Sequence, residues 1–475
     1  MGEGGGCSGK MVDRISNLSD EVVHRILSFL VIKDLTRFGC VSKRSRELYL
    51  SAPSLDFDIS PFEKPLKLLS SLDRFLFIHR EVNKIQRFRI SWCDLLRNGE
   101  QKLYFSDDVS FRVITWILNA VRCKVEVLEI VAGFFMERRY SLPSSVFLCG
   151  SLRSLLLTRG CTILKAPSLA SSSNLEYLKL DDVFIEDEGF FKWISCSCKC
   201  IKELHLEDIF GINQITIESS SLKSFSFVLD SPAYIDCILS ISAEKLEDIL
   251  VHLDLHNSVK NLVNIFAPNL KYLKLSGDDV WIGQSLGKST SLEKAEFFLD
   301  SNRRCFKILS EVLCSINKVE TLVLNRETTM AVFYGDFMPL LLKNVCYLSI
   351  HVGSFRDMLV PGMVSTFEGM CNLSTLEIES DPEFFEPKTD CSGFNMGYWR
   401  LQNLSFIHQL KEVTIELSIG SNGIQFAKYV LEHAQNLKKM TVFHAPQQSK
   451  AVRKITKSKI ASSAKLVFLE DRERG

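Results

Sequence analysis

Hydrophobic residues recur along most of this chain in the pattern L-x-x-L-x-L, with any aliphatic or aromatic residue at the L positions. Thirteen copies are in register and begin at Val125, Leu152, Leu175, Ile201, Leu222, Leu246, Leu270, Leu292, Val319, Val345, Leu373, Leu410 and Leu437. A degenerate earlier copy begins at Ile85. Successive copies of the thirteen start 21 to 37 residues apart, a regularity that predicts a repeat architecture.

Each copy is predicted to be a short strand. Successive side chains of a strand point to opposite faces, so positions 1, 4 and 6 are expected in the core, and positions 3 and 5 point outward. Each strand would pair in parallel with the next, while the return segments cross the other face. Asp107–Val121 and Glu188–Ile194 have helical periodicity. The predicted fold class is therefore α/β, a curved parallel sheet with an irregular or helical convex side.

The repeat resembles the leucine-rich repeat, whose period is 20–29 residues. Val183, Ile209 and Asp278 stand where that family often has asparagine at position 9, so uneven coils are expected. The longest interval contains Asp381–Tyr398, which has two prolines and two glycines and is expected to be a long surface loop.

The segment that precedes the repeats has a different, helical pattern. Ser19 is a suitable N-cap, and Leu18 before it has the spacing of a hydrophobic staple. Apolar residues follow at three- and four-residue intervals: Val22, Val23, Ile26, Leu27 and Leu30. Leu35 begins a second apolar face, and Ser42 can cap a third helix. An N-terminal helical cap on the repeats is the alternative interpretation of this segment.

Residues 13–50 resemble the F-box. The resemblance rests on Asp13, Ile15, Leu18, Asp20, Glu21, Ile26, Leu27, Ser28, Phe29, Leu30, Lys33, Asp34, Val41, Ser42, Lys43 and Arg44. Ser19 stands where the family usually has proline, and Ser45 where it usually has tryptophan. The resemblance implies docking on a Skp-type adaptor of a cullin-based ubiquitin ligase. The adaptor-binding residues that it implies are Ile15, Leu18, Ser19, Asp20, Glu21, Val22, Val23, Ile26, Leu27, Leu30, Leu35 and Val41.

The segment Leu410–Val442 is predicted to form a strand, a turn, a helix and a second strand. It resembles the FBD domain, which accompanies F-boxes and leucine-rich repeats in many plant proteins. The match rests on the L-K-x-V-x-I start at Leu410 and on the runs Lys428–Glu432 and Leu437–Met440. The expected organisation is a disordered tail at 1–12, an F-box at 13–50, a connector at 51–65, a solenoid at 66–400, an FBD domain capping it at 401–445 and a basic tail at 446–475.

Charge and composition exclude several classes of protein. Lys and Arg number 57, as do Asp and Glu, so no overall field favours nucleic acid or an anionic membrane. The N-terminus lacks the apolar core of a secretory signal, and no apolar run approaches the roughly 20 residues of a membrane span. The fifteen cysteines are expected to be reduced thiols, which indicates the cytoplasm or nucleus.

Candidate chemistry is sparse. Cys196, Cys198 and Cys200, with His205 nearby, have a C-x-C spacing that does not suit structural zinc. No P-loop or G-x-S-x-G motif is present, so neither catalysis, a metal nor a cofactor is expected. A basic run near the C-terminus could be a nuclear-localisation or anion-binding segment, or simply a solvated helix: Lys450, Arg453, Lys454, Lys457 and Lys459.

The outward strand positions are the candidate target-binding surface, because solenoids use such faces for binding and tyrosine is enriched in interfaces. The residues at positions 3 and 5 are Tyr177, Lys179, Glu203, His205, Tyr272, Lys274, Lys294, Glu296, Tyr347 and Glu377. The loop at Asp381–Tyr398 is the alternative binding site.

The leading hypothesis is a non-catalytic substrate receptor of an SCF-type ligase, with a Skp-type adaptor, a cullin scaffold and an unknown protein target as partners. The first alternative is an interaction scaffold outside any ligase, with a degenerate F-box. A small-molecule co-receptor ranks lower, because no convergent basic cluster is apparent.

Overall fold

The computed structural model describes residues 15, 17–58, 70, 72–73, 75–76, 84–92, 107–132, 140–159, 162–167, 172–230, 237–254, 261–278, 280–282, 291–300, 312–313, 316, 318–334, 342–380 and 391–470. They belong to two compact units. The first comprises Met1–Ile201 and Ile209–Gly211, and the second comprises Lys202–Asp208 and Ile212–Gly475. The predicted tail at 1–12 lies outside the described residues. None of the described helices is long and apolar enough to cross a membrane.

Three short helices begin the first unit: α1 (Asp20–Leu27), α2 (Ile32–Gly39) and α3 (Lys43–Leu50). The predicted cap of the third helix is confirmed, because Ser42 Oγ accepts a hydrogen bond from the Ser45 backbone N–H at 3.0 Å. The cap expected at Ser19 is not formed by its side chain, although Ser19 occupies the N-cap position. Arg44 instead ties α3 to the start of α1, donating to the carbonyl of Leu18 at 2.6 Å and to Asp20 Oδ1 at 3.1 Å.

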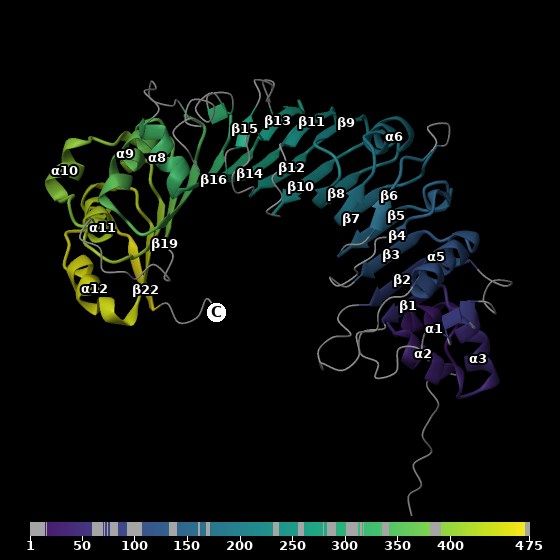
Figure 1. Ribbon diagram of the computed structural model, residues 1–475. Coiled ribbons are helices and arrows are strands. Elements are labelled where there is room, and N and C mark those ends of the chain that lie inside the picture. Colours follow the sequence, from purple (N-terminus) through teal and green to yellow (C-terminus); the bar gives the residue numbers. More distant parts are fainter. Residues whose placement is uncertain are drawn as a thin grey trace, which may run out of the picture. The chain divides into compact units, whose positions relative to one another are not determined.

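Parallel strands follow in the first unit, where each main strand pairs with the next (Figure 1). They are β1 (Ser54–Asp58), β2 (Arg87–Trp92), β3 (Val127–Ala132), β5 (Ser154–Thr158) and β7 (Tyr177–Ile185). The short strands β4 (Tyr140–Ser141) and β6 (Thr162–Leu164) pair with each other, and β6 pairs with β7. The return segments include α5 (Asp107–Arg122), η1 (Ser144–Val146) and α6 (Gly189–Ser197), and α5 and α6 confirm the two predicted helices.

The segment 51–65 contains a strand, so the predicted connector must be corrected. Strand β1 lies within it and pairs in parallel with β2. Leu55 and Phe57 alternate with polar residues and are buried, as positions 4 and 6 of a repeat would be. The three prolines of this segment are typical of a connector, so the sequence did not indicate a strand here.

The second unit has a longer parallel sheet, in which each strand again pairs with its successor. In order, its strands are β8 (Glu203–Phe210), β10 (Ser224–Leu229), β12 (Asp248–Leu253), β14 (Tyr272–Asp278), β16 (Lys294–Asp300), β17 (Thr321–Asn325), β18 (Tyr347–Gly353), β19 (Thr375–Ser380), β20 (Glu412–Glu416), β21 (Lys439–His444) and β22 (Lys465–Glu470).

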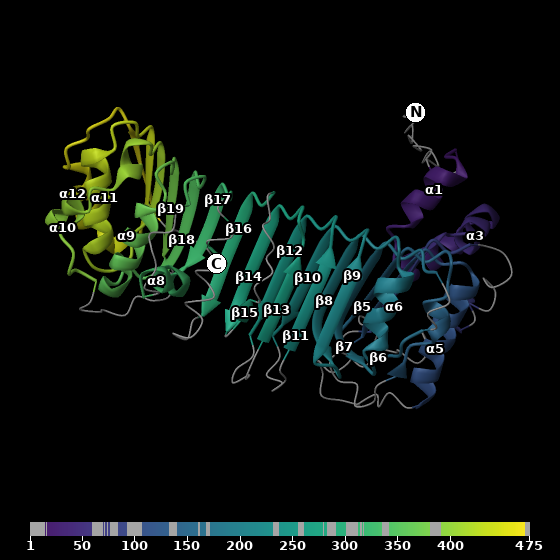
Figure 2. The same cartoon turned by 90° about the horizontal axis from the view of Figure 1, so that it is seen from above.

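Four return segments of the second unit form another parallel sheet, which was not predicted from the sequence (Figure 2). Its strands are β9 (Gln214–Ser219), β11 (Cys237–Ala243), β13 (Asn261–Phe266) and β15 (Val280–Ile282). Alternating residues such as Ile215, Ile217, Leu239 and Ile241 are buried, so this part of the solenoid is closed by strands and not by helices.

Among the described residues, other return segments of the second unit contain helices, as the predicted fold class implies. They include α8 (Arg326–Tyr334), η2 (Asp357–Leu359), α9 (Val360–Glu368), α10 (Met396–Leu401), η3 (Ser405–His408), α11 (Asn422–His433), η4 (Pro446–Gln448) and α12 (Ser449–Thr456). The combination of N-terminal helices, a repeat-built parallel sheet and mixed return segments confirms the predicted α/β leucine-rich-repeat class.

The core is built from the repeat positions. Positions 1, 4 and 6 of all thirteen copies are buried. The strand register aligns equivalent positions, so that Leu273 of β14 lies between Ile249 of β12 and Ala295 of β16. Each copy therefore buries its apolar residues against its two neighbours, as expected of a solenoid.

The C-terminal segments need two corrections. Residues 381–390 of the predicted loop lie outside the described residues, while Met396–Tyr398 already belong to α10. The predicted tail at 446–475 contains α12 and also β22, which pairs with β21 and extends the sheet. Only two half-buried apolar residues, Leu466 and Phe468, carry the repeat spacing in β22, too weak a signal to detect from sequence.

A buried amide holds the FBD region to the preceding repeat. Asn422 donates through Nδ2 to the carbonyl of Phe355 at 3.0 Å and to Asp357 Oδ1 at 2.7 Å. Its Oδ1 accepts from the Phe394 backbone N–H at 3.2 Å. One fully buried side chain therefore joins three segments, and its loss would leave buried polar groups without partners.

We expect Leu273→Asp to lower the free energy of unfolding of the second unit by about 3–5 kcal/mol, because it buries an unpaired charge at position 4. Denaturant unfolding followed by circular dichroism measures this loss. Lys245→Asp, at an exposed position, is the control and should leave the midpoint nearly unchanged. Equal midpoints for both variants would contradict the assignment of Leu273 to the core.

Candidate functional site

The three N-terminal helices expose a group of apolar side chains that we call the F-box surface. It consists of Ile15, Val22, Ile26, Phe29, Val31 and Val41. Phe29 is 81% exposed and Val41 77% exposed, although both are large apolar residues. Several exposed large apolar side chains within one short segment make that segment a candidate protein–protein contact site.

The helical period separates this surface from the helical core. Val22 and Ile26 lie four residues apart on one face of α1, whereas Val23 and Leu27 lie on the neighbouring face and are buried. Leu48 of α3 is buried with them in the helical segment. The core face therefore holds the helices together, and the other face remains accessible to a partner.

This separation corrects part of the predicted adaptor site. Val23, Leu27 and Leu35 are at most 2% exposed, so they pack inside the segment and cannot contact an adaptor directly. The other predicted residues stay accessible: Ile15, Ser19, Asp20, Glu21, Val22, Ile26 and Val41 are exposed, and Leu18 and Leu30 are half-buried. Phe29 and Val31 were missed as site residues, because they lie in the turn after α1 and outside its helical stripe.

The outward strand face of the second unit is the other candidate site. Four of its predicted residues meet on the adjacent strands β14 and β16. Lys294 Nζ lies 2.7 Å from Glu296 Oε1 and 5.2 Å from the centre of the Tyr272 ring. Lys274 Nζ lies 3.7 Å from Glu296 Oε2. Two cations and an aromatic ring thus surround one carboxylate.

The proton affinities of this cluster reflect its geometry. Burial raises the pKa of the Tyr272 hydroxyl to about 12, and the negative charge of Glu296 adds to the shift. Burial alone would raise the pKa of Glu296, but hydrogen bonding to Lys294, the charges of both lysines and the Tyr272 hydroxyl outweigh it, so that this pKa is lowered. The carboxylate is therefore ionised and Tyr272 protonated near neutral pH.

A second predicted pair lies on β18 and β19. The Tyr347 hydroxyl donates a hydrogen bond to Glu377 Oε2. Burial raises the pKa of Tyr347, and the bond to Glu377 raises it further. On β8, His205 Nε2 lies 3.7 Å from Glu203 Oε2. The structure thus joins the eight predicted residues of this unit into groups that pair among themselves.

Position 7, which was not among the predicted outward positions, continues the outward face. Lys274 Nζ lies 5.3 Å from the ring centre of Phe298, whose ring packs edge-on against His351 at 5.0 Å. His351 Nδ1 lies 3.3 Å from Glu379 Oε2. Strict alternation from position 5 would have placed these side chains on the same face.

In the first unit, the outward face carries an ion-pair ladder. Arg89 at position 5 of β2 donates to Asp56 of β1 at 2.9 Å and to Glu129 of β3 at 3.0 Å. Hydrogen bonds to both carboxylates raise the pKa of Arg89 against the opposing effect of burial. The predicted residues Tyr177 and Lys179 lie on β7 of the same unit.

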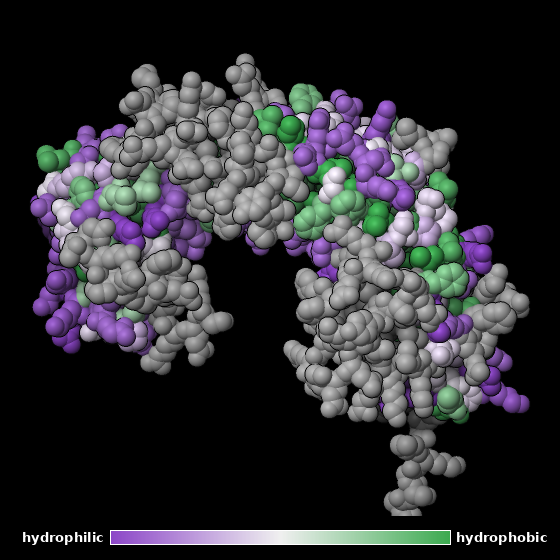
Figure 3. Space-filling view, viewed as in Figure 1, coloured by the Kyte–Doolittle hydropathy of each residue, from purple (hydrophilic) through white to green (hydrophobic). Residues whose placement is uncertain are grey.

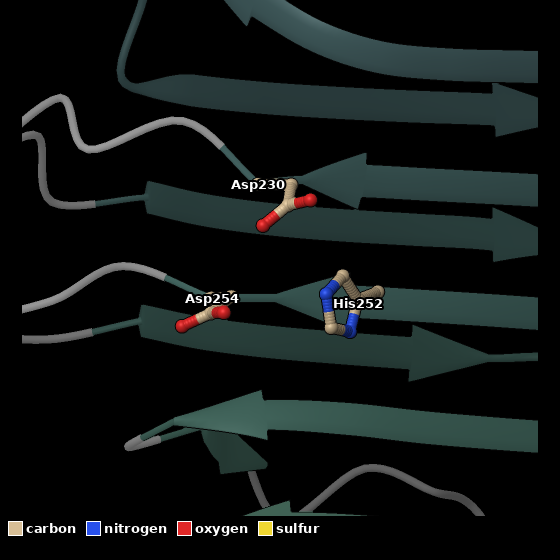
Figure 4. Close-up of side chains that lie close together, drawn as sticks. All are labelled: Asp230, His252 and Asp254. Atoms are coloured by element: carbon tan, nitrogen blue, oxygen red, sulfur yellow. The ribbon is translucent and has the colours of Figure 1, made fainter.

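Among the described residues, one group of three side chains brings possible metal-ligating atoms within 4.8 Å of one another: Asp230, His252 and Asp254 (Figure 4). Two carboxylates and an imidazole suit a divalent transition metal. His252 Nδ1 lies 2.9 Å from Ser276 Oγ, which orients the ring. Asp230 and Asp254 each follow a strand of adjacent repeats, so the register of the sheet alone explains their proximity.

The cysteines considered for zinc differ in exposure. Cys198 is buried, and burial raises the pKa of its thiol to about 12, which keeps it protonated. Cys196 and Cys200 are exposed. A protonated thiol is a poor metal ligand, because metals bind the thiolate.

Three family models match the chain. They are the F-box domain at residues 15–48, the LRR repeats of FBD-associated F-box protein At5g56370 at residues 113–319, and FBD at residues 405–442. An F-box implies binding to a Skp-type adaptor, and leucine-rich repeats imply protein–protein interaction.

Proteins of Arabidopsis thaliana are similar over most of the chain. FBD-associated F-box protein At4g13985 is 25% identical over 94% of both chains. Putative F-box/FBD/LRR-repeat protein At1g66300 is 24% identical over 97% of this chain and 95% of its own. F-box/LRR-repeat protein 13 is 26% identical over 91% of this chain and 89% of its own. These relatives confirm the predicted resemblance.

Among solved structures, the crystal structure of a TLR13–ssRNA13 complex matches with a TM-score of 0.38 and 15% sequence identity. The match covers 88% of this chain and 60% of that chain.

We expect Glu296→Gln to reduce stability at neutral pH, because the lowered pKa of Glu296 means that its ionised form stabilises the folded state. That contribution is present above the ordinary glutamate pKa of 4.5 and disappears as the pH falls through the folded-state value. Unfolding curves of the wild type and the variant should therefore differ at pH 7 and converge in acid. A difference that grows on acidification would contradict this assignment.

Proposed function

We propose that this chain, which combines an F-box, leucine-rich repeats and an FBD, is the substrate-recognition subunit of an SCF-type cullin ubiquitin ligase. The F-box binds a Skp-type adaptor and through it a cullin scaffold. The repeats bind a protein target. The chain carries out no bond chemistry itself; the reaction belongs to other subunits.

The F-box surface is the observation that carries this proposal. Its apolar side chains come from the segment before α1, from α1, from the turn that follows and from the α2–α3 turn, while a separate set of residues holds the helices together. Burying such a surface in a complex removes apolar area from water at about 25 cal/mol per Å². The arrangement supports docking on a partner that offers an apolar groove.

The two surfaces explain how a non-catalytic protein promotes ubiquitination. A target held by the repeats and a ligase held by the F-box belong to one assembly, so target lysines meet the charged ubiquitin carrier at high effective concentration. The rate gain comes from proximity and orientation, and not from chemistry on this chain. The cytoplasm and nucleus, where such ligases act, remain the proposed compartments.

One observation favours the alternative of an interaction scaffold outside any ligase. Ser45 is buried in α3 where the family usually has tryptophan, so a large aromatic contact is replaced by a small hydroxyl that hydrogen-bonds Ser42. Ser19 likewise lacks the fixed backbone that proline would supply. A weakened F-box would leave the repeats as the only strong interaction surface.

We expect the double variant Ile26→Asp, Phe29→Asp to lose adaptor binding, because two charges would enter an apolar interface. Loss of two anchors at about 2 kcal/mol each corresponds to a decrease in affinity of about 700-fold. Co-purification of a Skp-type adaptor with the full-length chain, followed by titration, measures the effect. Leu27 is not suitable for this test, because it is buried and its substitution would unfold the helices.

The matched control is Met358→Asp, Leu401→Asp, which introduces the same charges at exposed apolar positions of the second unit. It should retain adaptor binding. A folded F-box double variant that binds adaptor as the wild type does would exclude this surface. If the wild-type chain itself failed to bind adaptor, the scaffold alternative would replace the ligase proposal.

We propose that the outward strand face of the second unit holds the target, with Tyr272 and Tyr347 as its large rigid side chains. Tyr272→Ala and Tyr347→Ala should each weaken target binding by about thirtyfold, since truncating an interface tyrosine costs about 2 kcal/mol or more. Calorimetry with the target identified by affinity purification measures this loss, and adaptor binding should be unchanged. Replacement of residues 381–390 by a Gly/Ser linker tests the loop; loss of binding in that variant alone would overturn the proposed site.

A further inference from the structure

The C-terminal part of the chain is strongly basic, although the chain as a whole is neutral. Residues 433–469 contain eight Lys and Arg and no Asp or Glu, whereas the full sequence has 57 of each kind. We call these eight residues the basic surface: Lys438, Lys439, Lys450, Arg453, Lys454, Lys457, Lys459 and Lys465. All eight are exposed in the structure. Five of them form the basic run near the C-terminus, and the other three lie beside or on two neighbouring strands.

One part of the basic surface lies on and just after α12. Arg453 and Lys454 follow Lys450 by three and four residues, and Lys457 follows them by four and three, which places all four along one side of the helix. Ala451 and Ile455, four residues apart, are buried. The helix is therefore anchored by its apolar side and presents its cations to solvent. Figure 1 places α12 at the lower left, where the outer surface in Figure 3 is mainly hydrophilic.

The other part lies where β21 and β22 begin. Lys439 and Lys465 are register partners on these parallel strands, whose backbones lie about 4.8 Å apart. The Lys465 backbone N–H donates to the carbonyl of Lys438 at 2.9 Å, which brings a third lysine to the same end. Like charges that face each other across strands destabilise a sheet, so this arrangement does not serve stability.

The α12 part and the strand part of the basic surface are joined by a short link. Lys465 follows Lys459 by six positions, a span of at most about 20 Å even when fully extended. Ala461, in the link between them, donates its backbone N–H to the carbonyl of Leu431 at 2.9 Å, which holds the link against α11. At physiological ionic strength the screening length is about 8 Å, so only cations that lie this close, such as Lys439 and Lys465 on adjacent strands, produce a common field.

We propose that the basic surface binds an acidic, Asp/Glu-rich segment of a partner protein. Seven of the eight cations are lysines, which are flexible point charges suited to a diffuse set of carboxylates; bidentate phosphate recognition favours arginine. A single-stranded nucleic acid would need aromatic side chains on which bases stack, and residues 433–469 contain no exposed aromatic residue. An anionic membrane would take up the apolar side of α12, but Ala451 and Ile455 are already buried in the protein.

This inference does not depend on the ligase proposal. It concerns a surface of the FBD region and the strand after it, and its test involves neither the adaptor nor the target. Failure of the F-box experiment would therefore leave it standing, and its own failure would leave the ligase proposal intact.

The experiment measures binding of a fluorescein-labelled Asp/Glu-rich peptide to the full-length chain by fluorescence anisotropy, at low and at physiological ionic strength. The variant Lys454→Glu, Lys457→Glu, Lys459→Glu should bind about tenfold more weakly at low ionic strength, with a shallower dependence on salt. A second variant, Lys438→Glu, Lys439→Glu, Lys465→Glu, should show the same loss and provides an independent test if the first is unstable.

The matched control is Lys192→Glu, Lys245→Glu, Lys318→Glu, which makes the same change of net charge at exposed lysines elsewhere. It should bind the peptide nearly as the wild type does. A loss as large in this control, or wild-type binding by both basic-surface variants, would overturn the proposal. Tighter binding of single-stranded DNA or of phosphatidylserine vesicles than of the peptide, at equal ionic strength, would also overturn it in favour of nucleic acid or membrane.

Discussion

The parallel register of the strands is the constraint on which this protein depends. Each strand places its position-4 residue beside the position-4 residues of its neighbours, as with Ile249, Leu273 and Ala295. Every repeat thereby buries its apolar side chains only when the next repeat is present. Because side chains alternate along a strand, the same register that builds the core also aligns positions 3, 5 and 7 on the opposite face.

That alignment explains why the candidate binding face is organised in clusters. Lys294, Glu296 and Lys274 meet because their strands are neighbours, and each carboxylate finds a cation or a hydroxyl nearby. A target that binds here must compete with these internal contacts, so selectivity would come from charge and shape complementarity more than from apolar area. The F-box surface has the opposite character, since its exposed side chains are mainly apolar.

The C-terminal region combines both kinds of contact. Asn422 and the aromatic side chains around Trp399 and Phe426 build a dense core there. Outside that core, the basic surface concentrates positive charge in a chain whose other parts must be acidic on balance. The protein therefore presents three chemically distinct surfaces, one apolar, one of mixed charge and one basic, and each suits a different class of protein partner.

The sequence by itself determined the repeat and most of the secondary structure and core that follow from it. The spacing of apolar residues located most strands, the core positions and the helices α5 and α6, because period-2 and period-3.6 patterns depend only on local geometry. The domain order could also be predicted from short motifs at both ends, and the outward residues Tyr272 and Lys274 from their repeat positions.

Only the tertiary structure decided which of several equally apolar residues became buried. Val22 and Val23 are adjacent and identical in chemistry, yet the packing of the helices buries one and exposes the other. Strands β1 and β22, and the second sheet, depend on neighbours far along the chain that satisfy their backbone groups. The pairing of Lys294 with Glu296, and the meeting of Lys439 with Lys465, likewise follow from register, because contacts between repeats are absent from any local pattern.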